Sequence, residues 1–381
     1  MVMILLDFGG IDYSIKSVLA SAEFFASFAF PLAFIVSLLV SLSNLNLMRK
    51  EGANWRNMLG FILGVGICFI KMDKTILVIG ASGSQGGEVY KLLQKKKSSK
   101  LEYSKEKNQN LLKKQELKEL KKARAEGAEV VIGDLDDESS LVKAMENVYG
   151  VFSVLTISIK NHDSEVLQET NIVSAAEKNN VQILIHSSVA RAEEQQSFVD
   201  WNEKDRTPFY HKYWENKTKS INVVKESKIP HWVILKPVWM MDNLLKGRAD
   251  TILPDLKNGI IENNVKLDTK IDLICALDQA KFVSAALQNI EKFDKKEITL
   301  GCEALTFTEM AEIYTKYTNK PVKVSYIDPK ELIKKGIHKT IVDSFEWDNL
   351  EGYKTDFEKV KSYGIKLTSF DEFCQLYKEY L

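Results

Sequence analysis

The chain has 381 residues, of which 45% are hydrophobic and 27% are charged, an ordinary composition for a globular protein. Its 52 basic side chains are balanced by 52 acidic ones, so no overall field attracts nucleic acid, and we expect no direct nucleic-acid binding. The four cysteines are far apart and the five histidines are scattered. This argues against a disulfide framework and against a metal site.

Residues 1–71 are a hydrophobic N-terminal extension. Residues 24–48 carry no charge, and a single transmembrane helix over about residues 24–45 would be long enough to cross a bilayer. The basic residues just beyond it would then leave the rest of the chain facing the cytosol. The extension is equally compatible with a non-native upstream addition, because Met72 directly precedes an enzyme-like domain. We therefore expect either a cytoplasmic protein or a membrane-anchored one that touches the membrane only through this extension.

A short apolar strand is predicted over residues 75–79, where it runs directly into a glycine-rich loop and a helix over residues 88–94. Strand, glycine loop and helix in this order are typical of a dinucleotide site. Gly80 permits the tight turn, Gly83 lets a pyrophosphate approach the backbone, and Gly86 lets the helix pack closely. The loop residues that we expect to contact a cofactor are Gly80, Ser82, Gly83, Ser84, Gln85 and Gly86.

Strands and helices alternate through the next part of the chain. Strands are predicted over residues 129–132, 151–155, 182–186 and 231–235, with helices over about 138–147, 165–179 and 213–227. Continuous apolar strands in such an alternation predict an α/β fold with a doubly wound parallel sheet. A further strand is expected around residues 100–104, inside a lysine-rich region. Ligands of this fold bind at the carboxyl ends of the strands, so the residues just after each strand are site candidates.

Three segments together resemble the NmrA-like family of atypical short-chain dehydrogenase/reductase proteins. They are ILVIGASGSQGG, GAEVVIGDLDDESSL and YWENKTKSINVVKESKIPHWVILKPVWMMDNLL. The resemblance covers residues 74–381 and leaves residues 1–71 without a counterpart. It implies an NAD(P)-binding Rossmann domain over residues 73–240 and a smaller mixed α/β lobe over residues 241–381, intertwined with it and closing over the substrate.

The resemblance also implies cofactor contacts beyond the glycine loop. Asp134 and Leu135 would flank the adenine, Thr156 and Ser187 would line the nicotinamide half, and Pro237 would close it.

The choice between NADP(H) and NAD(H) depends on the residues after the second strand. Where the family offers an arginine for a 2′-phosphate, this chain has SKEKN, so Lys105 or Lys107 would substitute, less rigidly than a guanidinium. Glu102 is the acidic alternative for a ribose diol. The resemblance therefore favours NADP(H) over NAD(H).

Tyr213 and Lys217 are the catalytic candidates, because positions i and i+4 share one face of a helix. We expect the Lys217 ammonium to bind the nicotinamide ribose and to lower the pKa of Tyr213 toward a range useful for proton donation. Ser187 or Ser188, at the end of the preceding strand, would orient a substrate carbonyl. A tyrosine and a lysine also occur at this spacing by chance, and the two serines serve equally well as a helix cap.

Two functions remain open at this point. The first is an NAD(P)H-dependent oxidoreductase that reduces a carbonyl, enone or quinone substrate. The second is a non-catalytic NADP(H)-sensing regulator that binds a protein partner. Sensor-type members of the family commonly lack the tyrosine, which this chain has at position 213. The partner is accordingly either a small-molecule substrate or a regulatory protein.

Overall fold

The computed structural model describes residues 74–95, 101–105, 129–155 and 161–381, and residues 74–381 belong to one compact unit. The transmembrane helix expected over about residues 24–45 lies outside the described residues. Within the described ranges, no helix is both long and apolar enough to cross a membrane.

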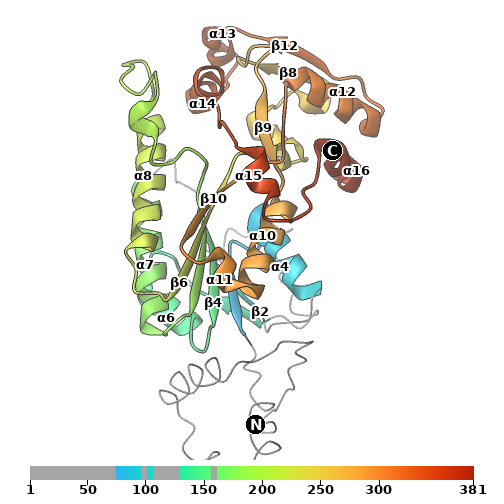
Figure 1. Cartoon of the computed structure of the whole chain (residues 1–381). Coiled ribbons are helices and arrows are strands. Elements are labelled where there is room, and N and C mark those ends of the chain that lie inside the picture. Colours follow the sequence, from blue (N-terminus) through green and yellow to red (C-terminus); the bar gives the residue numbers. More distant parts are fainter. Residues whose placement is uncertain (1–73, 96–100, 106–128, 156–160) are drawn as a thin grey trace, which may run out of the picture. The chain divides into compact units, whose positions relative to one another are not determined.

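A seven-stranded sheet forms the centre of this unit, in the order β10-β6-β5-β4-β1-β2-β3 (Figure 1). Its strands are β1 (Ile76–Ile79), β2 (Leu101–Lys105), β3 (Glu129–Ile132), β4 (Gly150–Val154), β5 (Ile183–Ser187), β6 (His231–Pro237) and β10 (Lys296–Leu300). All neighbouring pairs are parallel. The strand order reverses between β1 and β4, so the carboxyl ends of these two strands form the crevice in which this fold binds ligands. The predicted doubly wound sheet is confirmed.

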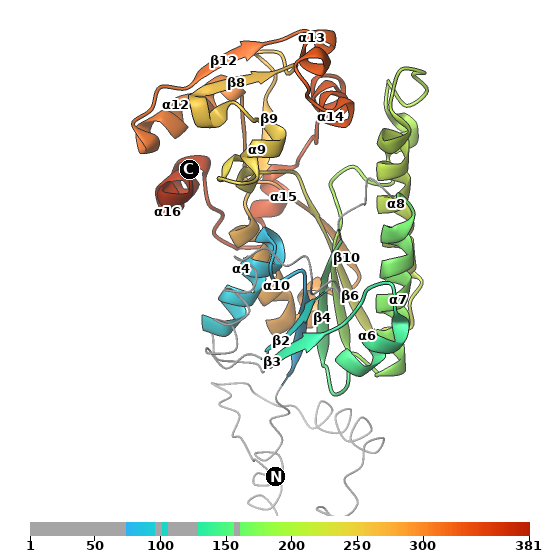
Figure 2. The same cartoon turned by 180° about the vertical axis from the view of Figure 1, so that it is seen from behind.

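Helices cover both faces of the sheet (Figure 2). One face is covered by α4 (Ser84–Lys95) and α10 (Ala276–Gln288), and the other by α6 (Glu138–Ala144), α7 (Ser164–Lys178) and α8 (Pro208–Lys225). Side chains along β1 alternate between the two faces: Ile76 and Val78 pack toward α4 and α10, while Leu77 and Ile79 pack toward the other helices. Each face therefore has its own hydrophobic core.

The C-terminal part builds two small sheets, with orders β11-β9-β7 and β12-β8. Their strands are β7 (Trp239–Met240), β8 (Ile260–Asn263), β9 (Ile271–Ile274), β11 (Glu303–Leu305) and β12 (Lys323–Tyr326). The remaining α-helices of the described residues are α9 (Ala249–Ile252), α11 (Ile290–Phe293), α12 (Phe307–Thr318), α13 (Pro329–Lys334), α14 (Lys339–Leu350), α15 (Phe357–Lys361) and α16 (Phe370–Leu376). Short 3-10 helices occur at Gln195–Ser197, Met241–Leu244, Leu256–Asn258 and Lys378–Tyr380. The chain does not stay in this lobe, because α10, α11 and β10 return to the large sheet.

Two helices that carry candidate residues begin earlier than the sequence pattern predicts. The helix expected from residue 88 begins at Ser84, because Gly87 N donates to Gly83 O (2.9 Å) inside the glycine run. The helix expected from residue 213 begins at Pro208, where the Thr207 side chain caps it by accepting from Tyr210 N. Glycine and cap residues start these helices without contributing to apolar periodicity.

Candidate functional site

The glycine loop turns sharply at the carboxyl end of β1. Gly80 has a φ of +74°, a left-handed conformation that favours glycine, and its carbonyl accepts from Gly83 N (2.8 Å). A Cβ at Gly80 would lie 2.8 Å from Cγ1 of Val154 on β4. A Cβ at Gly86 would overlap the Gly80 carbonyl, so only glycine lets α4 start this close to β1.

The loop has the features of a phosphate cradle. Ser82 and Gly83 are exposed, so the backbone of the turn is accessible. The Ser84 hydroxyl is buried at the first position of α4 and has no hydrogen-bond partner among the described residues. Backbone N–H groups at a helix N-terminus favour anions. An accessible turn, an unpaired hydroxyl and a helix start together fit a pyrophosphate.

The other expected cofactor contacts lie at the carboxyl ends of neighbouring strands. After β3, Asp134 is half-buried and its carboxylate accepts from Asp136 N (3.1 Å). Leu135 is 7% exposed, and its side chain belongs to a core cluster. Lys105 ends β2 in register with Ile132, which places its backbone beside the end of β3.

Of the remaining candidates at or after the strand ends, the structure describes only some. Pro237 is buried at the end of β6, where its carbonyl accepts from Ala190 N (3.0 Å). Thr156 and Lys107 lie outside the described residues, as does the side chain of Lys105.

Ser187 is held inside a hydrogen-bond bridge between two helices. Its hydroxyl donates to Gln85 Oε1 (2.7 Å) and accepts from Gln279 Nε2 (2.6 Å), and the residue is 1% exposed. The bridge ties β5 to α4 and α10. Ser188 is also buried, and its hydroxyl has no hydrogen-bond partner within the described ranges.

Tyr213 and Lys217 share one face of α8, as their spacing predicts. The Lys217 Nζ lies 5.8 Å from the centroid of the Tyr213 ring. It also donates to the carbonyl of Leu155 (3.4 Å), directly after β4. The glycine loop also lies beside the end of β4, since a Cβ at Gly80 would touch Val154, the last residue of that strand. The ammonium and the glycine loop therefore lie at the same edge of the sheet.

The main partner of Lys217 is a carboxylate that the sequence pattern did not indicate. Nζ forms an ion pair with Glu165 Oε1 at 2.6 Å, and both residues are buried, at 5% and 0% exposure. Burial opposes the charged form of the lysine, but Glu165, Tyr213 and Glu169 outweigh it and raise the pKa of Lys217 above its usual value.

The pKa of Tyr213 is raised, so the expected net lowering is wrong. Burial is the main cause, and Glu165 adds to it. Lys217 does lower the pKa, but it does not compensate, since its charge is balanced by Glu165. The phenol of Tyr213 is therefore protonated at neutral pH, which suits a hydrogen-bond or proton donor.

A buried polar network continues behind this ion pair. One turn along α7, Glu169 lies 3.2 Å from Nδ1 of His186 and accepts from the Ser153 hydroxyl at 3.1 Å. All three residues are 0% exposed. Glu165 and Glu169 occupy positions of α7 that line up with buried Ile172. Two glutamates on the apolar face of a helix are the signal that could have revealed this network.

Half-buried aromatic rings lie next to the pair on α8. Phe209 stacks on Tyr213 with a centroid distance of 6.4 Å and an interplanar angle of 25°. His162 meets the Phe209 ring edge-on at 5.4 Å. All three side chains are half-buried. They offer a partly open aromatic surface beside Lys217.

The C-terminal part contributes groups to the same region. Tyr353 packs against Trp347 at a centroid distance of 4.9 Å. Burial, then Asp348 and then Tyr213 raise the pKa of Tyr353 well above its usual value. Asp348 is 8% exposed, and its Oδ1 has no hydrogen-bond partner among the described residues. Burial and nearby Asp272 raise its pKa as well. Tyr353 and Asp348 were not foreseen, because they belong to a segment far from α8 in sequence.

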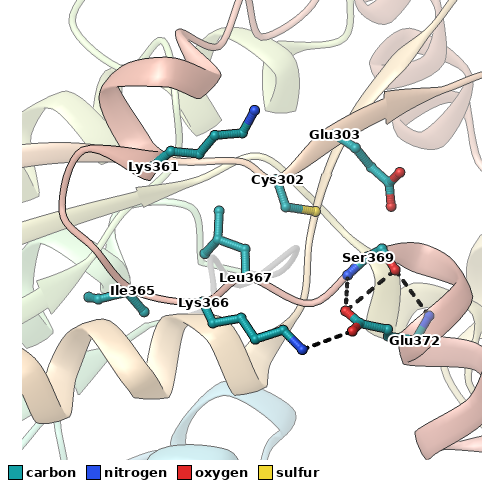
Figure 3. Close-up of a pocket in the computed structure, with 8 residues that line it drawn as sticks. All are labelled: Cys302, Glu303, Lys361, Ile365, Lys366, Leu367, Ser369 and Glu372. Carbon is teal, nitrogen blue, oxygen red and sulfur yellow. Dashed lines mark hydrogen bonds and ion pairs between the residues drawn. The ribbon is translucent and has the colours of Figure 1, made fainter.

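A pocket of about 330 Å³ lies in the C-terminal part (Figure 3). It is lined by Cys302, Glu303, Lys361, Ile365, Lys366, Leu367, Ser369 and Glu372. The Glu372 carboxylate caps α16 and binds Lys366, while burial raises the pKa of the Cys302 thiol. None of the predicted site residues lines this pocket. Its polar side chains already have partners, either one another or groups outside the pocket.

Comparison with known proteins gives a family match and several structural matches. Residues 72–380 match the NmrA-like family. The Citrobacter sp. triphenylmethane reductase complexed with NADP(H) has a TM-score of 0.61 and 17% identity over 79% of this chain and 99% of that chain. The NADPH-dependent quinone oxidoreductase from Escherichia coli, complexed with NADPH, has a TM-score of 0.60 and 19% identity over 79% and 99%. A nucleoside-diphosphate-sugar epimerase from Staphylococcus aureus has a TM-score of 0.58 and 17% identity over 79% and 99%. These likenesses support the same fold.

Proposed function

Because the chain belongs to the NmrA-like family, we propose that it is an NADP(H)-dependent oxidoreductase that reduces a small carbonyl, enone or quinone substrate. The observation that carries this proposal is the position of the Lys217 ammonium. It reaches the carbonyl that follows β4, at the edge of the sheet where the glycine loop lies. A buried cation and a protonated phenol thus stand beside the crevice in which this fold binds dinucleotides.

The glycine loop would hold the pyrophosphate of the cofactor. The N–H groups at the start of α4 and the unpaired Ser84 hydroxyl would bind the phosphate oxygens. Lys105, at the end of β2, would approach a 2′-phosphate of NADP(H). When bound, the nicotinamide would supply the hydride.

The residues on α8 would prepare the substrate. The Lys217 ammonium would bind the ribose hydroxyls next to the nicotinamide. The raised pKa of Tyr213 keeps its phenol protonated, so it would donate a proton to the substrate oxygen that gains electrons. The stacked rings of Phe209 and Tyr213 offer a face for a flat, conjugated substrate.

The comparisons support the cofactor more directly than they support the reaction. Two similar structures are described as NADP(H)-bound or NADPH-bound reductases, whereas a third is described as an epimerase. A shared fold hosts several reactions, so the proposal of a reductase rests on the side chains around Lys217.

A cofactor-sensing regulator that binds a protein partner is the second candidate. The observation that favours it is the Ser187 hydroxyl, which Gln85 and Gln279 already engage, so that it is not directed at a substrate carbonyl.

Turnover assays separate the two functions. We expect NADPH oxidation with a simple para-quinone or an enone, followed by absorbance. Tyr213→Phe is expected to lower kcat by about 10²-fold to 10⁴-fold without changing NADPH affinity, because general-acid catalysis contributes that much. Tyr326 on β12 is exposed, so Tyr326→Phe is the matched control and is expected to leave kcat unchanged. NADPH binding without turnover on any carbonyl, enone or quinone would favour the regulator.

A further inference from the structure

Among the described residues, the carboxylate of Glu165 has a single ionic partner, Lys217, and both side chains are buried. Glu165 lies in the first turn of α7 and Lys217 in the middle of α8, with 2.6 Å between Oε1 and Nζ. The second oxygen of Glu165 has no hydrogen-bond partner among the described residues. Among the described residues, the ion pair with Lys217 is therefore the main interaction of this carboxylate.

Glu169 cannot take over this role, although it lies one turn along the same helix. Its two oxygens face other groups: one accepts from Ser153 on β4, and the other lies against Nδ1 of His186 on β5. In the part of the chain that the structure describes, the titratable and charged groups around Lys217 are therefore Glu165 and Glu169 from α7 and Tyr213 from its own helix, with His186 behind Glu169. Of these, only Glu165 forms an ion pair with the ammonium.

We propose that Glu165 is a positioning residue, which keeps Lys217 charged and directs its ammonium toward the end of β4, where it would bind the nicotinamide ribose. This inference rests on the proposed function. Without a carboxylate partner, a buried lysine loses its proton readily, because burial favours the neutral form. A neutral, mobile amine would be a poorer and less well-directed donor to the ribose hydroxyls.

The experiment compares Glu165→Gln with the wild-type full chain. Once the carboxylate is gone, burial is expected to determine the charge of Lys217 and to favour its neutral form. NADPH affinity should then fall at a pH about two units lower than in the wild type. The KM for NADPH is expected to rise by about tenfold or more, with a smaller change in kcat. Glu165→Asp keeps the charge and is expected to restore the alkaline limb partly. Glu177→Gln is the matched control, since Glu177 lies on the same helix but binds the backbone N of Lys228 at the surface.

Two further measurements keep the inference falsifiable. If Glu165→Gln unfolds, the double variant Glu165→Gln/Lys217→Met removes both charges and is expected to be more stable than either single variant. An NMR titration of ¹⁵N-labelled lysine Nζ reports the charge of Lys217 without any cofactor. If the wild-type chain fails to bind NADPH, the proposed function is refuted. The NMR titration would still test whether Glu165 keeps Lys217 charged. Two results for Glu165→Gln would overturn the role of Glu165. One is an NMR titration of Lys217 that is the same as in the wild type. The other is a lower Tm together with the pH profile and the KM for NADPH of the wild type.

Discussion

Gly86 is the position at which the structure most tightly restricts the side chain. A Cβ there would overlap the Gly80 carbonyl and lie 2.8 Å from Ala81 N, below the 3.0 Å that real Cβ atoms essentially never undercut. These neighbours are backbone atoms, so no rotamer change can relieve the overlap. Gly86→Ala must therefore move the start of α4 away from β1.

The expected size of the effect follows from two opposing contributions. Overpacking of a well-packed site costs about 1–3 kcal/mol. Alanine in place of a helical glycine returns about 0.5–1 kcal/mol. We expect the free energy of unfolding to fall by about 1–2 kcal/mol. NADPH affinity is expected to fall by more than tenfold, since a displacement on the order of 1 Å at a preorganised site can cost about 100-fold.

Urea unfolding and an NADPH titration measure the two effects separately. Gly87→Ala is the matched control, because its Cβ would lie 3.3 Å from Ala81 O and needs only a small adjustment. We expect this control to keep its NADPH affinity and to change stability by less than about 1 kcal/mol. The reasoning is refuted if Gly86→Ala binds NADPH as the wild type does and is no less stable than Gly87→Ala.

Three further substitutions test other parts of the account. Arg206→Met is expected to lower the free energy of unfolding by about 3–5 kcal/mol in urea, because it removes the ionic partner of buried Asp200, whereas Asp343 keeps its ion pair with Lys339; a loss below about 1 kcal/mol would contradict this. Burial raises the pKa of Asp242 to about 6, so this carboxyl contributes stability at low pH that is lost as the pH rises from about 4 through 6. The stability of Asp242→Asn relative to wild type should therefore rise by about 2 kcal/mol from pH 4.5 to pH 8, and the same difference at both pH values would contradict this. Ser187→Ala should cost about 1–3 kcal/mol through its lost bonds to Gln85 and Gln279, with kcat reduced less than tenfold; a loss of 100-fold would instead assign Ser187 to catalysis.

Strands β1, β3, β4, β5 and β6 of the large sheet were predictable because they are short, largely apolar and rich in β-branched residues, whereas β10 was not predicted. The strand expected around residues 100–104 is β2 at Leu101–Lys105, and the strand expected over residues 129–132 has those bounds. The start of α8 was missed, because Thr207 and Pro208 begin the helix by capping rather than by periodicity. Helix starts of this kind are recognised from cap residues, not from the apolar pattern.

The pairing of Lys217 with a carboxylate on another helix could not be predicted from local sequence. Lys217 was found through its spacing from Tyr213, which depends only on helix geometry. Its partner Glu165 lies in another helix, and only the packing of α7 against α8 brings the two together. The pKa of Tyr213 consequently moves in the direction opposite to the prediction, because burial and Glu165 outweigh the lysine.

The most direct test of the central claim is a fluorescence titration of the purified full chain with NADPH and with NADH. The variant Gly83→Trp is the blocked control, since a side chain at this exposed turn would fill the space that a pyrophosphate needs. We predict saturable binding of NADPH, weaker binding of NADH, and loss of both in the control. Binding of neither dinucleotide to the wild-type chain, or equal binding of NADPH to Gly83→Trp, would contradict the claim that the glycine loop holds a nicotinamide cofactor.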